Sequence, residues 1–162
     1  MGEPYRGLLQ ELVAALRRRL GDALVSVVVF GSVARGEAGR ESDVDLLVVA
    51  EGLPRSRLRR QDLFMEVEEE VRPVLEELAE LGYHVELSPI LKTPEEAARV
   101  TPLYLDMVED AVVLYDRGGF FSGILERLRR RLGELGAERV RCGKLWYWRL
   151  KRDYRFGEVI EI

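Results

Sequence analysis

Residues 30–49 read FGSVARGEAGRESDVDLLVV, and this stretch decides the fold. An apolar run ends at Phe30, the chain turns at Gly31-Ser32, and a second apolar run opens through Asp43 and Asp45. Because alternate residues of a strand share a face, the two carboxylates point the same way, where they repel unless a cation lies between them. A Gly-Ser turn that opens a helix offers backbone N–H groups and a hydroxyl to phosphate oxygens. The stretch therefore indicates nucleotide chemistry.

The elements around this stretch follow from apolar periodicity and from the glycine and proline residues that end helices. The valine-rich run before Gly31 is typical of a buried strand, and the run that begins at Leu46 is apolar on both faces, as in a sheet covered on both sides. The sequence predicts helices at residues 5–20, 32–36, 56–81, 94–100, 101–109 and 120–135, strands at 23–30, 43–50, 83–91 and 110–115, and an extended tail at 140–162.

The composition is that of a soluble globular protein. The chain has 162 residues, of which 47% are apolar and 33% are charged, and this length suits one domain with a real core. No segment is long and apolar enough for a membrane span, and the N-terminus lacks the layout of a secretory signal. The single cysteine, Cys142, fits a reducing compartment, so we expect a cytoplasmic protein. No P-loop, dinucleotide fingerprint or zinc-ligand spacing occurs, which excludes those protein classes.

The pattern Gly31-Ser32-x-Ala34-Arg35-Gly36-Glu37-x5-Asp43-x-Asp45, followed by aliphatic residues, resembles the nucleotidyltransferase superfamily that includes DNA polymerase β. It is most similar to the small, stand-alone minimal nucleotidyltransferase (MNT-type) group. The resemblance is specific over residues 23–50, and the order of elements agrees more loosely through residue 91. It implies an α/β (α+β) fold with a mixed central β-sheet flanked by helices, here followed by a basic C-terminal extension.

The resemblance also implies roles for single residues. Asp43 and Asp45 would hold two divalent cations, Mg²⁺ or Mn²⁺, because oxygen ligands suit these ions. Gly31 would let the phosphates approach the backbone, and Ser32 would donate its hydroxyl to one of them. Arg35 would also bind phosphate, or would only brace the loop against a neighbouring glutamate. Members of the superfamily have a third carboxylate on a later strand, and the candidate here is Glu86, as catalytic base or metal ligand, although aspartate is more usual there.

The resemblance therefore implies a nucleotidyltransferase that moves a nucleoside monophosphate from an NTP, ATP being the expected one, to a hydroxyl and releases pyrophosphate. The acceptor is a small molecule, an RNA or a partner protein such as a HEPN-domain toxin, and a homo-oligomer is compatible with the sequence. The alternative is a module of the same fold with little or no catalytic activity, which acts as an antitoxin or binds RNA.

The C-terminal part of the chain differs in charge from the rest. Residues 117–155 carry twelve basic and four acidic side chains, a net charge of +8 that leaves −12 elsewhere. This segment would meet phosphates or nucleic acid, or its arginines would pair with the acidic helix at 56–81. Trp146-Tyr147-Trp148 would stack on bases, or would pack in the core or in a subunit interface. We expect a nucleotidyltransferase core at residues 1–116, with the helix and tail of residues 117–162 packed on it as part of a single structural domain.

Overall fold

The structure, a computed structural model, describes all residues from 1 to 162. Its α-helices are α1 (Tyr5–Leu20), α2 (Gly31–Arg35), α3 (Arg57–Glu80), α4 (Pro94–Ala97), α5 (Leu103–Asp110) and α6 (Phe120–Leu135). Its strands are β1 (Leu24–Phe30), β2 (Val44–Ala50), β3 (Leu87–Lys92), β4 (Val112–Asp116), β5 (Glu138–Cys142) and β6 (Leu145–Arg149), and two short 3-10 turns cover Gly21–Ala23 and Arg117–Gly119. No helix has the length and apolar character needed to cross a membrane.

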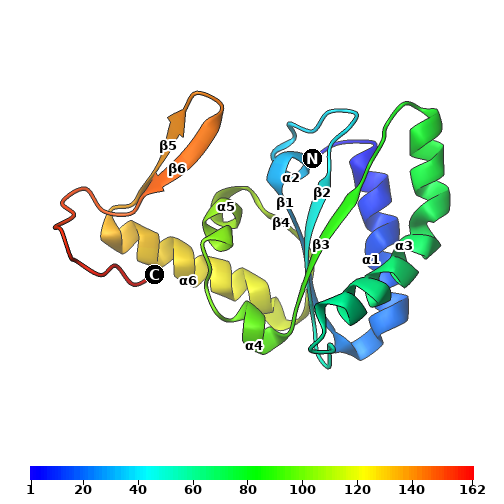
Figure 1. Cartoon of the computed structure of the whole chain (residues 1–162), viewed down its shortest axis with the longest axis horizontal. Coiled ribbons are helices and arrows are strands. Elements are labelled where there is room, and N and C mark those ends of the chain that lie inside the picture. The colour runs from blue at the N-terminus through cyan, green and yellow to red at the C-terminus, as the bar shows by residue number, and fades with distance from the viewer.

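The centre of the molecule is a four-stranded sheet in the order β3-β2-β1-β4 (Figure 1). β1 runs antiparallel to both β2 and β4, whereas β2 and β3 are parallel, so the sheet is mixed as predicted. A parallel pair needs a crossover connection, and α3 supplies it between β2 and β3. The α/β (α+β) fold with a mixed sheet flanked by helices is confirmed.

Helices cover both faces of this sheet. α1 and α3 pack on one face, and Figure 1 shows them together on the side away from α6. α5 and α6 pack on the other face. β2 shows why both faces are apolar: Leu46 and Val48 belong to the first core, and Leu47 and Val49 belong to the second. All four side chains are fully buried, which confirms the expectation of a sheet covered on both sides.

The third strand is shorter than predicted. The sequence predicts a strand at residues 83–91, but β3 begins only at Leu87, and Glu86 lies in the loop before it. Gly82 turns the chain with a φ of 84°, and the segment after it makes isolated backbone contacts instead of a ladder. The N–H of His84 donates to the carbonyl of Arg40 over 2.7 Å, and the N–H of Val44 donates to the carbonyl of Glu86 over 2.8 Å. Edge residues with so few partners do not form a regular strand.

The C-terminal part contains one helix that belongs to the core and one hairpin that projects from it. α6 buries Phe121, Ile124 and three leucines in the second core. The hairpin of β5 and β6 forms a separate two-stranded sheet, which extends away from the main body in Figure 1. The boundary between residues 116 and 117 stays a prediction.

The basic side chains of this part do not pair with the acidic helix, so that expectation is wrong. The acidic side chains Glu66 and Glu70 of α3 pair with Arg18 and Arg19 of α1, which lies beside it. The C-terminal cations pair elsewhere: the ion pairs are Arg117 with Glu51, Arg131 with Glu134, Arg139 with Glu109 and Asp110, Arg149 and Arg152 with Glu138, and Lys151 with Glu158. Six of the twelve basic side chains of residues 117–155 therefore form ion pairs, and the other six form none.

The aromatic triplet divides between packing and exposure. The indole N–H of Trp148 donates to the carbonyl of Leu105 over 2.9 Å, and its ring packs against the second core. Trp146 and Tyr147 are exposed, and the guanidinium of Arg139 lies 4.7 Å from the centre of the Trp146 ring. Of the three aromatic residues, only Trp148 packs against the core, as one of the alternatives predicted.

Candidate active site

Gly31 and Asp45 approach each other at one end of the sheet. In the antiparallel pair of β1 and β2, Phe30 lies opposite Asp45, so the turn that opens α2 falls beside the start of β2. Gly31 has a φ of 73°, in the left-handed region that favours glycine. A Cβ atom there would lie 2.2 Å from Oδ2 of Asp45, far inside van der Waals contact. Glycine is thus required at this position both by the backbone and by the carboxylate that fills the space.

Asp43 and Asp45 form an electrostatically unfavourable pair. Asp43 is exposed just before β2, and Asp45 is half-buried on the face of the sheet that carries the second core. Burial raises the pKa of Asp45, the charge of Asp43 raises it further, and the guanidinium of Arg35 lowers it. A divalent cation would supply the compensation that this pair lacks, and oxygen donors are the ligands such a cation prefers. The side chains therefore fit the predicted metal.

Ser32 and Arg35 lie on α2, next to the aspartates. Ser32 is half-buried, and its backbone carbonyl accepts the N–H of Glu37 over 2.9 Å, which closes the end of the short helix. Nε of Arg35 donates to Oε2 of Glu37 over 2.9 Å, so the bracing role considered for this arginine is present. The influence of Arg35 on the pKa of Asp45 shows that its charge also reaches the aspartate pair. Both residues remain available to a phosphate.

Glu86 is tied to the aspartates through the backbone, but its carboxylate is not gathered with theirs. Its carbonyl accepts the N–H of Val44, the residue between Asp43 and Asp45, and β3 continues from there with Leu87 opposite Val44. The side chain of Glu86 is exposed. No group of three or more His, Cys, Asp or Glu side chains is spaced to hold a metal ion. The structure thus brings together Gly31, Ser32, Arg35, Asp43 and Asp45, and it leaves Glu86 at the border of the site.

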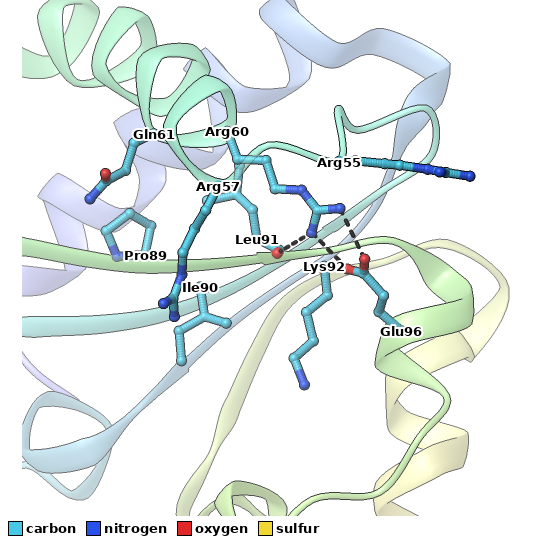
Figure 2. Close-up of a pocket in the computed structure, with 9 residues that line it drawn as sticks. All are labelled: Arg55, Arg57, Arg60, Gln61, Pro89, Ile90, Leu91, Lys92 and Glu96. Atoms are coloured by element: carbon cyan, nitrogen blue, oxygen red, sulfur yellow. Dashed lines mark hydrogen bonds and ion pairs between the residues drawn. The ribbon is translucent and has the colours of Figure 1, made fainter.

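Sequence reasoning missed a basic cavity at the edge of the same sheet, beside β3. It has a volume of about 650 Å³ and lies between the N-terminal end of α3 and β3 (Figure 2). The lining residues are Arg55, Arg57, Arg60, Gln61, Pro89, Ile90, Leu91, Lys92 and Glu96. The run Arg55-Ser56-Arg57-Leu58-Arg59-Arg60 was the available signal, but residues 55–61 and 89–96 are far apart in sequence, and only the fold brings them together.

Comparison with known proteins identifies the family of the chain. The model of a family described as "Nucleotidyltransferase domain" matches residues 9–115. A relative from Methanocaldococcus jannaschii, named "Putative protein adenylyltransferase MJ1305", is 35% identical over 124 residues, which are 75% of this chain and 79% of the relative.

Two solved structures are similar at low identity. One is a toxin–antitoxin complex with AMP-PNP, with a TM-score of 0.46 and 18% identity over 78% of this chain and 91% of the other. The second is a tri-AMPylated Shewanella oneidensis HEPN toxin in complex with an MNT antitoxin, with a TM-score of 0.44 and 16% identity over 81% of this chain and 92% of the other.

The family match covers most of the chain, including every residue of the Gly-Ser turn and the aspartate pair, and the match to the Methanocaldococcus jannaschii relative extends over a similar length. The chain therefore belongs to the nucleotidyltransferase domain family, the DNA polymerase β-like enzymes whose motif residues 31–45 resemble.

Proposed function

We propose that this nucleotidyltransferase transfers AMP from ATP to a hydroxyl group of a partner protein. The observation that carries the proposal is the close approach of Gly31 to Asp45, beside the exposed carboxylate of Asp43. This arrangement leaves an open backbone turn for phosphates directly next to two carboxylates. A fold alone does not specify a reaction, so the proposal rests on this site.

In the proposed reaction, the acceptor oxygen attacks the α-phosphorus of ATP. A new P–O bond forms to the acceptor, the bond between the α-phosphorus and the bridging oxygen of the β-phosphate breaks, and pyrophosphate leaves. The backbone at Gly31 and the hydroxyl of Ser32 bind the phosphate oxygens, while Arg35 adds positive charge next to them. Glu86 accepts the proton of the attacking hydroxyl after its side chain turns toward Asp43, a movement that its exposure allows.

Asp43 and Asp45 would hold Mg²⁺ or Mn²⁺, which when bound neutralises charge on the phosphates and lowers the pKa of the attacking hydroxyl. The side chain of Asp45 also lies against the Gly31 turn, which places the carboxylate pair next to this turn. The burial and the like charge that raise the pKa of Asp45 favour cation binding, because a cation removes the repulsion between the two carboxylates.

A protein acceptor is the best supported of the three classes of acceptor. The relative from Methanocaldococcus jannaschii, at 35% identity, has the name "Putative protein adenylyltransferase". RNA is less favoured, because half of the basic side chains of residues 117–155 are already held in ion pairs. The MNT-type resemblance makes a HEPN-domain toxin the first partner to test.

The test is to incubate the chain with Mg²⁺ and labelled ATP, CTP, GTP or UTP in extract of its own cells. We expect label from ATP in a protein band that protease removes and ribonuclease leaves. The double substitution Asp43→Asn, Asp45→Asn should abolish the labelling. The control Glu41→Gln, which removes an exposed carboxylate of the same loop, should leave the labelling unchanged. Label that survives the double substitution, or that ribonuclease removes, would contradict the proposal.

A further inference from the structure

The cavity beside β3 carries more positive charge than its own contacts use. Its lining contains four cations and one carboxylate. Arg60 is fully engaged: its guanidinium donates to both carboxylate oxygens of Glu96, over 2.7 and 2.9 Å, and to the carbonyls of Pro54 and Leu91. Among the cations drawn in Figure 2, only Arg60 has dashed interactions. The charges of Arg55, Arg57 and Lys92 therefore remain for a ligand.

Two of these cations flank an apolar floor. In Figure 2 the side chains of Arg57 and Lys92 extend to the same side of β3, with Ile90 between them. Lys92 is half-buried, its ammonium lies 5.0 Å from the centre of the Tyr104 ring, and burial lowers its pKa while Glu96 raises it. A partly desolvated ammonium without a close anion gains more from a ligand carboxylate than a fully solvated one does.

The cavity lies at the β3 edge of the sheet, and its residues Ile90 and Lys92 are on the same face as Asp45. In the parallel register, Asp45 is opposite Ser88, Leu47 is opposite Ile90 and Val49 is opposite Lys92. At a rise of about 3.3 Å per residue, Ile90 is about 7 Å and Lys92 about 13 Å along β3 from the level of Asp45. Ser88, at the level of Asp45, is exposed.

These features suit an acidic polypeptide better than a nucleic acid. The whole chain has a net charge of −4 and so does not attract polyanions over its surface. Its cavity combines unpaired cations with an apolar floor, which matches single carboxylate side chains spaced along a peptide. Pro89 lies on the edge strand and has no N–H to donate, so the peptide would be held by its side chains and not as an added strand.

We propose that this cavity binds a carboxylate side chain of the acceptor polypeptide, about two to four residues from the hydroxyl that receives the nucleotide. The spacing follows from the 7 to 13 Å span and the reach of about 3.3–3.6 Å per residue of an extended chain. This inference rests on the proposed transfer to a protein. It adds a sequence preference for the acceptor.

The test uses two fluorescein-labelled peptides, each with a central Tyr. One has Glu at the second to fourth positions on either side, and the other has Gln there. Fluorescence anisotropy without nucleotide should show at least about tenfold tighter binding of the Glu peptide, since hydrogen bonds to charged groups are strong. Arg57→Gln and Lys92→Gln should each reduce this preference. Arg59→Gln, an exposed arginine of the same helix outside the cavity, is the matched control and should retain it.

A transfer assay with the same peptides, ATP and Mg²⁺ separates this inference from the proposed function. We expect Arg57→Gln to raise KM for the Glu peptide and to leave kcat unchanged, as for lost ground-state binding. Equal transfer to both peptides would overturn the cavity assignment and leave the protein adenylyltransferase proposal standing. Preferential binding without transfer would support the cavity and count against tyrosine as the acceptor. Displacement of the Glu peptide by oligouridylate more readily than by unlabelled Glu peptide would overturn the inference. Arg57 is exposed, so the Arg57→Gln variant decides the outcome even if Lys92→Gln fails to fold.

Discussion

A comparison of Gly31→Ala with Gly36→Ala separates two effects of a side chain at position 31. One is the cost of left-handed backbone, and the other is the displacement of the Asp45 carboxylate. Gly31 has a φ of 73°, and its added Cβ would lie 2.2 Å from Oδ2 and 3.2 Å from Cγ of Asp45. Gly36, which ends α2, has the same φ of 73° and nothing within 4 Å of its would-be Cβ. The two glycines therefore share the cost of left-handed backbone, and only Gly31 adds a clash with the site.

The expected magnitudes follow from these two contributions. A non-glycine residue in the left-handed region costs about 1–2 kcal/mol, which applies to both Gly31→Ala and Gly36→Ala. At Gly31 the carboxylate must also move by about 1 Å to reach ordinary contact, and an off-rotamer Asp45 adds about 0.5–1.5 kcal/mol. We therefore expect unfolding free energies lowered by about 1–2 kcal/mol for Gly36→Ala and about 1.5–3.5 kcal/mol for Gly31→Ala. Activity should separate them further, because a 1 Å displacement of a catalytic group costs on the order of 100-fold.

Urea denaturation at pH 7 measures the stabilities, and initial rates of nucleotide transfer at saturating Mg²⁺ measure activity. Asp45→Ala removes the clash, so Gly31→Ala introduced into that variant should cost only the backbone contribution, about the same as Gly36→Ala. This double-mutant cycle isolates the interaction between the two positions. Equal loss of activity in Gly31→Ala and Gly36→Ala, or an unchanged cost of Gly31→Ala in the Asp45→Ala background, would refute the reasoning.

Two further predictions concern ionised groups that stabilise the fold. Ser26 is fully buried and donates over 2.7 Å to Asp116; burial alone would raise the Asp116 pKa, but its hydrogen bonds together lower it. Ser26→Ala should lower the free energy of unfolding by about 1–3 kcal/mol in urea melts at pH 7. This difference should shrink as the pH falls below 3.8, the ordinary pKa of an Asp carboxyl, because the carboxyl of Asp116 is then protonated in the unfolded chain. A difference that does not depend on pH would contradict the hydrogen-bond account. Glu96 has its pKa lowered to about 2, chiefly by hydrogen bonds from Arg60, so its contribution is complete above pH 4.5 and disappears as pH falls toward 2. Because the Glu96 side chain is 45% exposed, Glu96→Gln should lower the free energy of unfolding by about 1 kcal/mol or less at pH 7, and should leave it unchanged near pH 2. A greater loss of stability at low pH than at pH 7 would refute the assignment.

The turn, the short helix and the aspartate pair could be predicted because their signals are local. Gly31-Ser32 ends a valine-rich strand, and the alternation of Asp45 with buried neighbours places it on one face whatever the partner strand is. The long helix and α6 were equally readable, since their apolar periods and glycine stops lie within one segment.

Features that depend on partners could not be predicted in this way. Whether Glu86 lies in a strand depends on how far the edge of β2 can pair with it, and only one backbone hydrogen bond reaches that far. The pairing of Glu70 with α1 instead of the C-terminal arginines depends on which helix packs beside α3. Charge counts give the number of ionic groups, but tertiary packing decides the pairs. The cavity between α3 and β3 depends on the fold for the same reason.

The most direct test of the central claim is to follow which phosphorus of ATP reaches the acceptor. Purified chain, the protein that becomes labelled in the cell extract, and Mg²⁺ are incubated with ATP labelled at the α-phosphorus or at the γ-phosphorus. Nucleotidyl transfer predicts label on the acceptor from the α position only, release of the γ label as pyrophosphate, and no labelling by the Asp43→Asn, Asp45→Asn double variant. Transfer of the γ label to the acceptor, or α labelling that persists in the double variant, would contradict the account.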